Sequence, residues 1–102
     1  MNTYVIVRRR GWPTVADLEE AAARSTAEGD RVPDDIRWIR SYVLAETDAT
    51  VGTVCVYQAS SPEAILRHAD AADLPATEII AVADTVIVRP DPVGCSTRNS
   101  GP

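Results

Sequence analysis

Residues 50–75, TVGTVCVYQASSPEAILRHADAADLP, contain a strand, a turn and a helix in immediate succession. From Thr50 to Gln58, apolar side chains occupy both alternating faces, which is typical of a strand in a sheet that is covered on both sides. Ser61 is a favourable helix N-cap, and Pro62 suits the first helical position. The apolar stripe of the predicted helix includes His68, the only histidine of the chain.

The remaining sequence predicts three more strands and one more helix around this unit. Thr3–Arg8 and Ile36–Glu46 have the alternation of strands, and the second of these leads through a short polar turn into a hairpin with the strand at Thr50. A helix begins after Thr14, and Ala76–Arg89 is predicted as a long fourth strand. The order β-α-β-β-α-β predicts a ferredoxin-like α+β fold, with a four-stranded antiparallel sheet and two helices on one face.

The other face of this sheet is predicted to remain apolar and uncovered. In the strand at 36–46, simple alternation places Ile36, Trp38, Tyr42 and Leu44 on one face and Ile39, Ser41 and Val43 on the other. A monomer would expose a large apolar patch on the uncovered face. We therefore expect a homodimer formed through the sheet faces, in the manner of a dimeric α+β barrel.

Length and composition indicate one ordinary globular domain. We assign residues 1–90 to this domain and residues 91–102, which are rich in proline, glycine and serine, to a disordered tail. The net charge of −5 argues against binding to a nucleic acid backbone. The absence of a membrane-spanning stretch or signal-peptide core indicates a cytoplasmic protein without membrane contact. Cys55 and Cys95 are expected to be free thiols in a reducing compartment.

A short basic run, Arg8-Arg9-Arg10, follows the first predicted strand. We interpret it as a solvated sheet edge or turn. The alternative is an anion-binding role, because the guanidinium fork suits phosphate and carboxylate groups.

His68 is the first candidate for chemistry, as a metal ligand, a general base or a pH sensor. The alternative is a core histidine whose ring nitrogens are hydrogen-bonded within the fold. No second histidine, cysteine or carboxylate lies three or four residues away, so other metal ligands must come from another strand or another subunit. Cys55 and Tyr57 are the nearest companions. A Cys55–His68 nucleophile pair competes with the simpler interpretation of Cys55 as a core residue.

Four segments in the same order resemble a family of small bacterial domains of unknown function. They are WIRSYV at 38–43, CVYQAS at 55–60, PEAILRHADAADLPA at 62–76 and EIIAV at 78–82. The resemblance implies a ferredoxin-like dimer, and, because that family includes a nickel-binding protein, nickel as a cofactor held by His68. The matching positions are Ser41, Tyr42, Cys55, Tyr57, Glu63, His68 and Pro75. Asp73 stands where the family usually ends its second helix with glycine.

These observations lead to one leading hypothesis and two alternatives. The leading hypothesis is a small non-catalytic binding protein that holds nickel or another transition metal through His68. We place its pocket between the second helix and the sheet, lined by Ser41, Tyr42, Cys55, Tyr57 and Glu78. The first alternative is a small-molecule binder, or a cofactorless enzyme of the α+β-barrel type, with His68 as acid and base; whether the chain is an enzyme stays open. The second is a pure interaction module.

Overall fold

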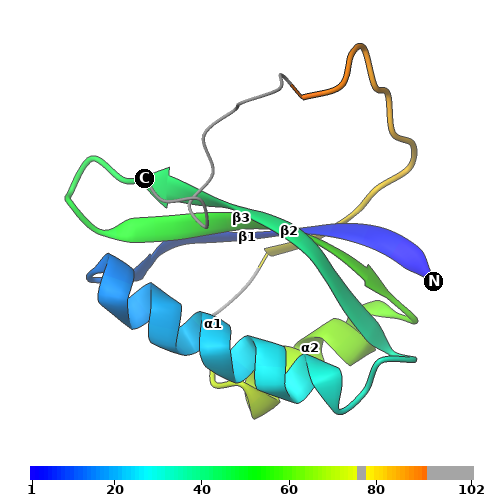
Figure 1. Cartoon of the computed structure of the whole chain (residues 1–102), viewed down its shortest axis with the longest axis horizontal. Coiled ribbons are helices and arrows are strands. Elements are labelled where there is room, and N and C mark those ends of the chain that lie inside the picture. Colours follow the sequence, from blue (N-terminus) through cyan, green and yellow to red (C-terminus); the bar gives the residue numbers. More distant parts are fainter. Residues whose placement is uncertain (76–77, 92–102) are drawn as a thin grey trace.

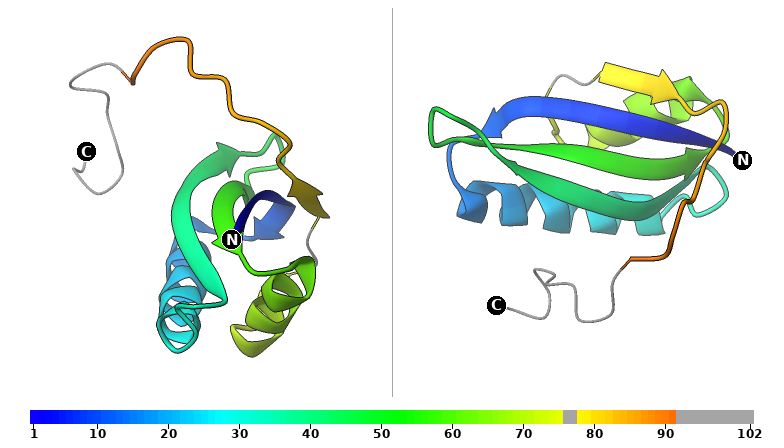
Figure 2. Two further views of the ribbon diagram at one scale, coloured as in Figure 1. Left: turned by 90° about the vertical axis from the view of Figure 1, so that its right-hand side faces the viewer. Right: turned by 90° about the horizontal axis from the view of Figure 1, so that it is seen from above.

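The computed structural model describes residues 1–75 and 78–91, which form an antiparallel α+β fold (Figure 1). The elements in chain order are β1 (Asn2–Trp12), α1 (Val15–Asp30), β2 (Ile36–Ala45), β3 (Val51–Ala59), α2 (Pro62–Ala71) and β4 (Glu78–Ala81). The strands lie in the order β2-β3-β1-β4, and every neighbouring pair is antiparallel. Both helices cover the same face of the sheet (Figure 2). The predicted ferredoxin-like fold is confirmed.

Both helices begin at the residues that the sequence indicates. The Thr14 hydroxyl accepts the backbone N–H of Asp17 at 3.2 Å, and the Ser61 hydroxyl accepts that of Ala64 at 3.1 Å. After α2 ends, Asp73 adopts the left-handed conformation, with φ of 54°. Glycine is the usual residue at such a helix end, so aspartate takes this conformation at some cost.

The core on the helix-covered face consists of two clusters. The larger one packs α2 against the centre of the sheet and comprises Tyr4, Ile6, Ile36, Cys55, Tyr57, Ala59 and Ile65. The smaller one packs the first turns of α1 against the far ends of β1 and β3 and comprises Trp12, Leu18, Ala21 and Val51. The two clusters hold the helices side by side against one face of the sheet.

An irregularity near the end of β1 is held by a buried carboxylate. The pairing of β1 with β3 shifts register between Arg8 and Trp12, and Arg10 takes a left-handed φ of 51°. Glu46 accepts hydrogen bonds from the guanidinium of Arg9 at 2.7 and 2.9 Å and from the backbone N–H of Arg10 at 2.8 Å. The Arg9 hydrogen bond, followed by that of Arg10, lowers the pKa of Glu46 from its ordinary 4.5 to about 2.

A bulge in β2 makes the predicted face assignment of that strand wrong beyond its midpoint. The register with β3 shifts between Trp38 and Arg40, which inserts one residue and inverts the alternation. Ser41 therefore lies on the helix-covered face, together with Trp38. Tyr42 pairs with Val54 on the opposite, open face.

The fourth strand is shorter than the predicted Ala76–Arg89, and the prediction is wrong for its second half. Regular pairing covers Glu78–Ala81, and the backbone N–H of Val82 still donates to the Thr3 carbonyl at 3.0 Å. Because β1 begins at Asn2, residues beyond position 83 have no strand to pair with in the described part of the chain. The segment 83–91 leaves the sheet and rises above its open face (Figures 1 and 2). Ala76 lies outside the described residues.

The predicted tail falls largely on residues 92–102, and this range, which includes Cys95, is outside the described part of the chain. Within the described part, neither helix has the length and apolar character needed to cross a membrane. The cytoplasmic location stays a prediction.

Candidate functional site

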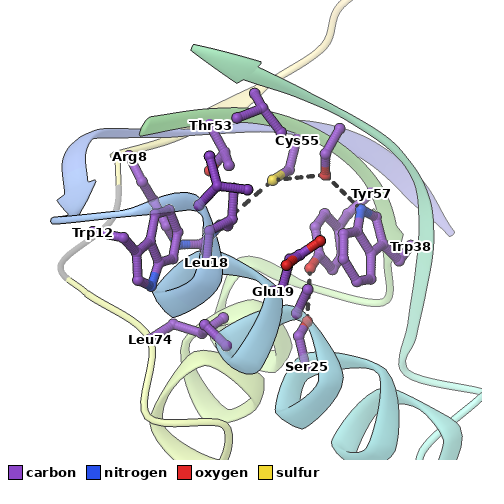
Figure 3. A pocket seen from close by; sticks show the side chains of 15 residues that line it. Arg8, Trp12, Leu18, Glu19, Ser25, Trp38, Thr53, Cys55, Tyr57 and Leu74 are labelled. Atoms are coloured by element: carbon purple, nitrogen blue, oxygen red, sulfur yellow. Dashed lines mark hydrogen bonds between the residues drawn. The ribbon is translucent and has the colours of Figure 1, made fainter. Parts of the chain in front are cut away.

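A cavity of about 130 Å³ lies between α1 and the sheet (Figure 3). It exists because the inward face of α1 carries the small residues Ala21, Ala22 and Ser25, which do not fill the space above β3. Most of its wall is apolar or aromatic, contributed by Trp12, Val15, Leu18, Ala21, Ala22, Trp38, Val43 and Leu74. Polar groups come mainly from the sheet side: Arg8, Ser41, Thr53, Cys55 and Tyr57. An apolar cavity with a few converging polar groups is the usual form of a small-molecule site.

A chain of hydrogen bonds runs along the sheet side of the cavity. The indole N–H of Trp38 donates to the Ser41 hydroxyl at 2.7 Å, and that hydroxyl donates to the Cys55 sulfur at 3.0 Å. The Arg8 Nη1 also donates to the Cys55 sulfur, at 3.6 Å. Cys55 therefore accepts two hydrogen bonds, and these hydrogen bonds fix the positions of the polar groups around its sulfur.

Tyr57 forms a second part of the wall and is 2 % exposed. Its hydroxyl lies 3.2 Å from the hydroxyl of Ser25, and its ring is stacked on Trp38 with the ring centres 5.9 Å apart. Burial raises the pKa of Tyr57. The phenol therefore remains protonated at neutral pH and provides a hydrogen-bonding group to the cavity wall.

His68 lies outside the lining of this cavity. Its ring is buried, and Nε2 is 2.9 Å from the backbone carbonyl oxygen of Ser25. A carbonyl oxygen only accepts hydrogen bonds, so Nε2 carries the hydrogen and donates it. The ring also contacts Tyr57 at a tilt of 57° and borders a wider cleft of about 750 Å³ between α1 and β2. His68 thus links α2 to α1.

The side chains around His68 do not fit a nickel centre within one chain. In residues 1–75 and 78–91, no group of three or more His, Cys, Asp or Glu side chains is placed to hold a metal ion. Nickel prefers several nitrogen, oxygen or sulfur donors. To bind a metal through Nε2, His68 would also have to lose the hydrogen that it donates to Ser25.

The structure brings together three of the predicted pocket residues and separates two. Ser41, Cys55 and Tyr57 all line the cavity under α1. Tyr42 is 54 % exposed on the open face, because of the bulge in β2. Glu78 also lies on the open face, opposite Val7 of β1. We expected the cavity between α2 and the sheet, but it lies between α1 and the sheet. Ile65 and the alanines of α2 pack closely against the sheet and fill the space there.

Two polar residues of the site were missed by the sequence interpretation. Arg8 is 3 % exposed, so the prediction of a solvated basic run is wrong for this residue. Its Nε and the hydroxyl of Thr53 are both buried without a hydrogen-bond partner. The signal was present in the alternation of β1, since Tyr4, Ile6 and Arg8 share one face and the first two are clearly core residues.

Comparisons with known proteins give a family and a fold. A family model described as "Nickel responsive protein SCO4226-like" matches residues 4–82. The crystal structure of SCO4226 from Streptomyces coelicolor A3(2) is similar with a TM-score of 0.63 and 22 % identity, covering 82 % of this chain and 99 % of that one. SnoaB, a cofactor-independent oxygenase from Streptomyces nogalater, matches with a TM-score of 0.45 and 21 % identity, covering 86 % and 98 % of the two chains. No curated protein matches the sequence significantly.

Proposed function

The chain belongs to the family described as nickel responsive protein SCO4226-like, and from the cavity between α1 and the sheet we propose that it is a binding protein for a small organic molecule. The observation that carries this proposal is the cavity itself, with its apolar wall and its polar groups on β1, β2 and β3. Buried polar groups normally have a hydrogen-bond partner within a fold, but among the described residues Arg8 Nε and the Thr53 hydroxyl have none. A bound molecule with polar atoms would satisfy them.

We propose a non-catalytic role. A cofactorless enzyme with His68 as acid and base would need its ring nitrogen at the bound molecule. The Nε2 atom instead donates to the Ser25 carbonyl, and His68 is not among the residues that line the cavity. The remaining side chains of the wall offer hydrogen bonds and apolar contact, which are the requirements of binding.

Benzyl alcohol, a small ring with one hydroxyl, is a suitable first probe. Trp12 and Trp38, the two tryptophans of the chain, both line the cavity, so tryptophan fluorescence will report occupancy. Ala22→Leu places a larger side chain in the cavity wall and should weaken benzyl alcohol at least about tenfold. Ala16→Leu, on the exposed side of the same helix, is the matched control and should leave the affinity unchanged. Equal affinities in the two variants would contradict the proposal.

The family description favours a second candidate function, nickel binding through His68. Calorimetric titration of the full chain with nickel tests it, with His68→Gln as the variant. Heat that the variant loses would support His68 as a ligand, completed by donors from a second subunit. Identical heats in both proteins would assign any nickel binding to other residues.

A further inference from the structure

We propose that the cavity under α1 is specific for a small carboxylate with a compact apolar body, and that Arg8 and Thr53 bind the carboxylate group. This inference rests on the proposed function and adds the chemical class of the ligand. The inference follows from two buried polar groups without a hydrogen-bond partner, Arg8 Nε and the Thr53 hydroxyl.

The Arg8 guanidinium is buried, and within residues 1–75 and 78–91 no carboxylate forms an ion pair with it. Arg8 is 3 % exposed, its Nε has no hydrogen-bond partner, and the hydrogen bond from Nη1 goes to the Cys55 sulfur 3.6 Å away. Its neighbours differ, since Arg9 pairs with Glu46 and Arg10 pairs with Asp48. Buried charges are normally paired, so Arg8 is the residue of this run that lacks its anion.

Thr53 lies directly beside Arg8 and faces the same side. The two residues are partners in the register of β1 and β3, and both line the cavity. Thr53 is 3 % exposed, and its buried hydroxyl has no hydrogen-bond partner. A carboxylate accepts about four hydrogen bonds through its two oxygens. One carboxylate between these side chains would therefore accept hydrogen bonds from the Arg8 guanidinium and from the Thr53 hydroxyl at the same time.

The size and the wall of the cavity restrict the rest of the ligand. An engineered protein cavity of about 150 Å³ holds benzene, so the volume of about 130 Å³ suits one ring or a short branched chain. The wall around it is formed by Trp12, Leu18, Trp38, Val43 and Leu74. A phosphate fits this environment poorly, because it carries more charge and Arg8 is the cationic side chain of the lining.

Benzoate and benzyl alcohol, which differ in their polar group, form the decisive pair of probes. In the unmodified chain we expect benzoate to bind about 10- to 100-fold more tightly than benzyl alcohol, because hydrogen bonds to a charged group are stronger than hydrogen bonds to a neutral one. Arg8→Gln should remove that preference, because it should weaken the binding of benzoate far more than the binding of benzyl alcohol. Arg67→Gln, which removes an exposed guanidinium on α2, is the control and should keep the preference.

Each outcome of these titrations decides between the two proposals. If neither probe binds, the proposed function fails and the inference fails with it. If both bind with similar affinity, the cavity binds small molecules but the carboxylate inference is overturned. A preference that persists in Arg8→Gln overturns it as well. Should Arg8→Gln not fold, Thr53→Val is the second variant: we expect it to reduce the preference about three- to tenfold, and an unchanged preference would contradict the role of this pair.

Discussion

Replacing Arg8 by methionine should make the protein more stable while it weakens binding. A binding residue that is held ready for a ligand costs stability in the free protein, whereas a structural residue contributes to it. Methionine has a similar length and an apolar stem, so it fills the same space without the charge. The buried position of Arg8 and its unpartnered Nε make it a suitable residue for this comparison.

The size of the effect follows from two opposing contributions. A buried donor without a partner destabilises the fold by about 1–3 kcal/mol, and Arg8→Met removes that cost. The variant also loses the hydrogen bond to Cys55, which is long at 3.6 Å and is worth about 0.5 kcal/mol, the low end of the usual range. We expect a net gain of about 0.5–2.5 kcal/mol in the free energy of unfolding. For a domain of this size, that corresponds to a rise in Tm of about 4–8 °C per kcal/mol.

Urea denaturation of the full chain, with and without benzoate, measures both consequences. Arg67→Met is the exposed control and should change stability by less than about 0.5 kcal/mol. Benzoate at a hundred times its Kd should stabilise the unmodified protein by about 2.7 kcal/mol and the Arg8 variant by much less, so the difference between them should close. A variant that is less stable than the unmodified protein by more than about 1 kcal/mol would refute the reasoning and make Arg8 a structural residue.

Three further predictions concern other parts of the fold. The folded-state pKa of Glu46 is about 2 and its ordinary value is 4.5, so its stabilising contribution is complete above pH 4.5 and is lost as the pH falls toward 2. The difference in Tm between the unmodified protein and Glu46→Gln should therefore shrink as the pH is lowered over that interval. The predicted homodimer should depend on the apolar segment above the open face, where Ile87 is 76 % exposed. Light scattering should show a dimer that Ile87→Glu disrupts and that the control Val32→Glu leaves intact. A monomeric unmodified protein would contradict the predicted dimer. Asp73→Gly should raise the free energy of unfolding by about 0.5–1 kcal/mol, because glycine suits the left-handed φ of 54°. Asp70→Gly, which lies inside α2, should instead lower it by about 0.3 kcal/mol.

The sequence was a good guide wherever one local rule decided the structure. The alternation of apolar residues located β1 and β3, and the capping residues Thr14 and Ser61 located the starts of both helices. These features depend on neighbours close in the chain, which is why a single sequence reveals them. The strand order then followed from the order of the elements.

The sequence was a poor guide where a distant neighbour decided the structure. The bulge in β2 moved Tyr42 to the open face, and no residue near Ile39 signals that extra residue. The apolar run after Val82 has the composition of a strand, but β1 begins at Asn2 and offers it no partner. Such an apolar segment without a strand partner is a typical place for pairing with a second chain. It adds a second reason to the one from which the dimer was predicted, the apolar open face of the sheet.

The same distinction explains why the candidate site moved from His68 to Arg8. A lone histidine on an apolar helix face attracts attention because histidine has many chemical roles, yet here its Nε2 donates to the Ser25 carbonyl and joins the two helices. Ser25 in turn lies within hydrogen-bond distance of Tyr57 in the cavity wall, so His68 acts on the site through the position of α1. Arg8 attracts little attention in an exposed-looking basic run, but the sheet places it among core residues without an anion. Lack of a partner, which only the folded structure reveals, is therefore the stronger indication of a ligand here than the versatility of a side chain.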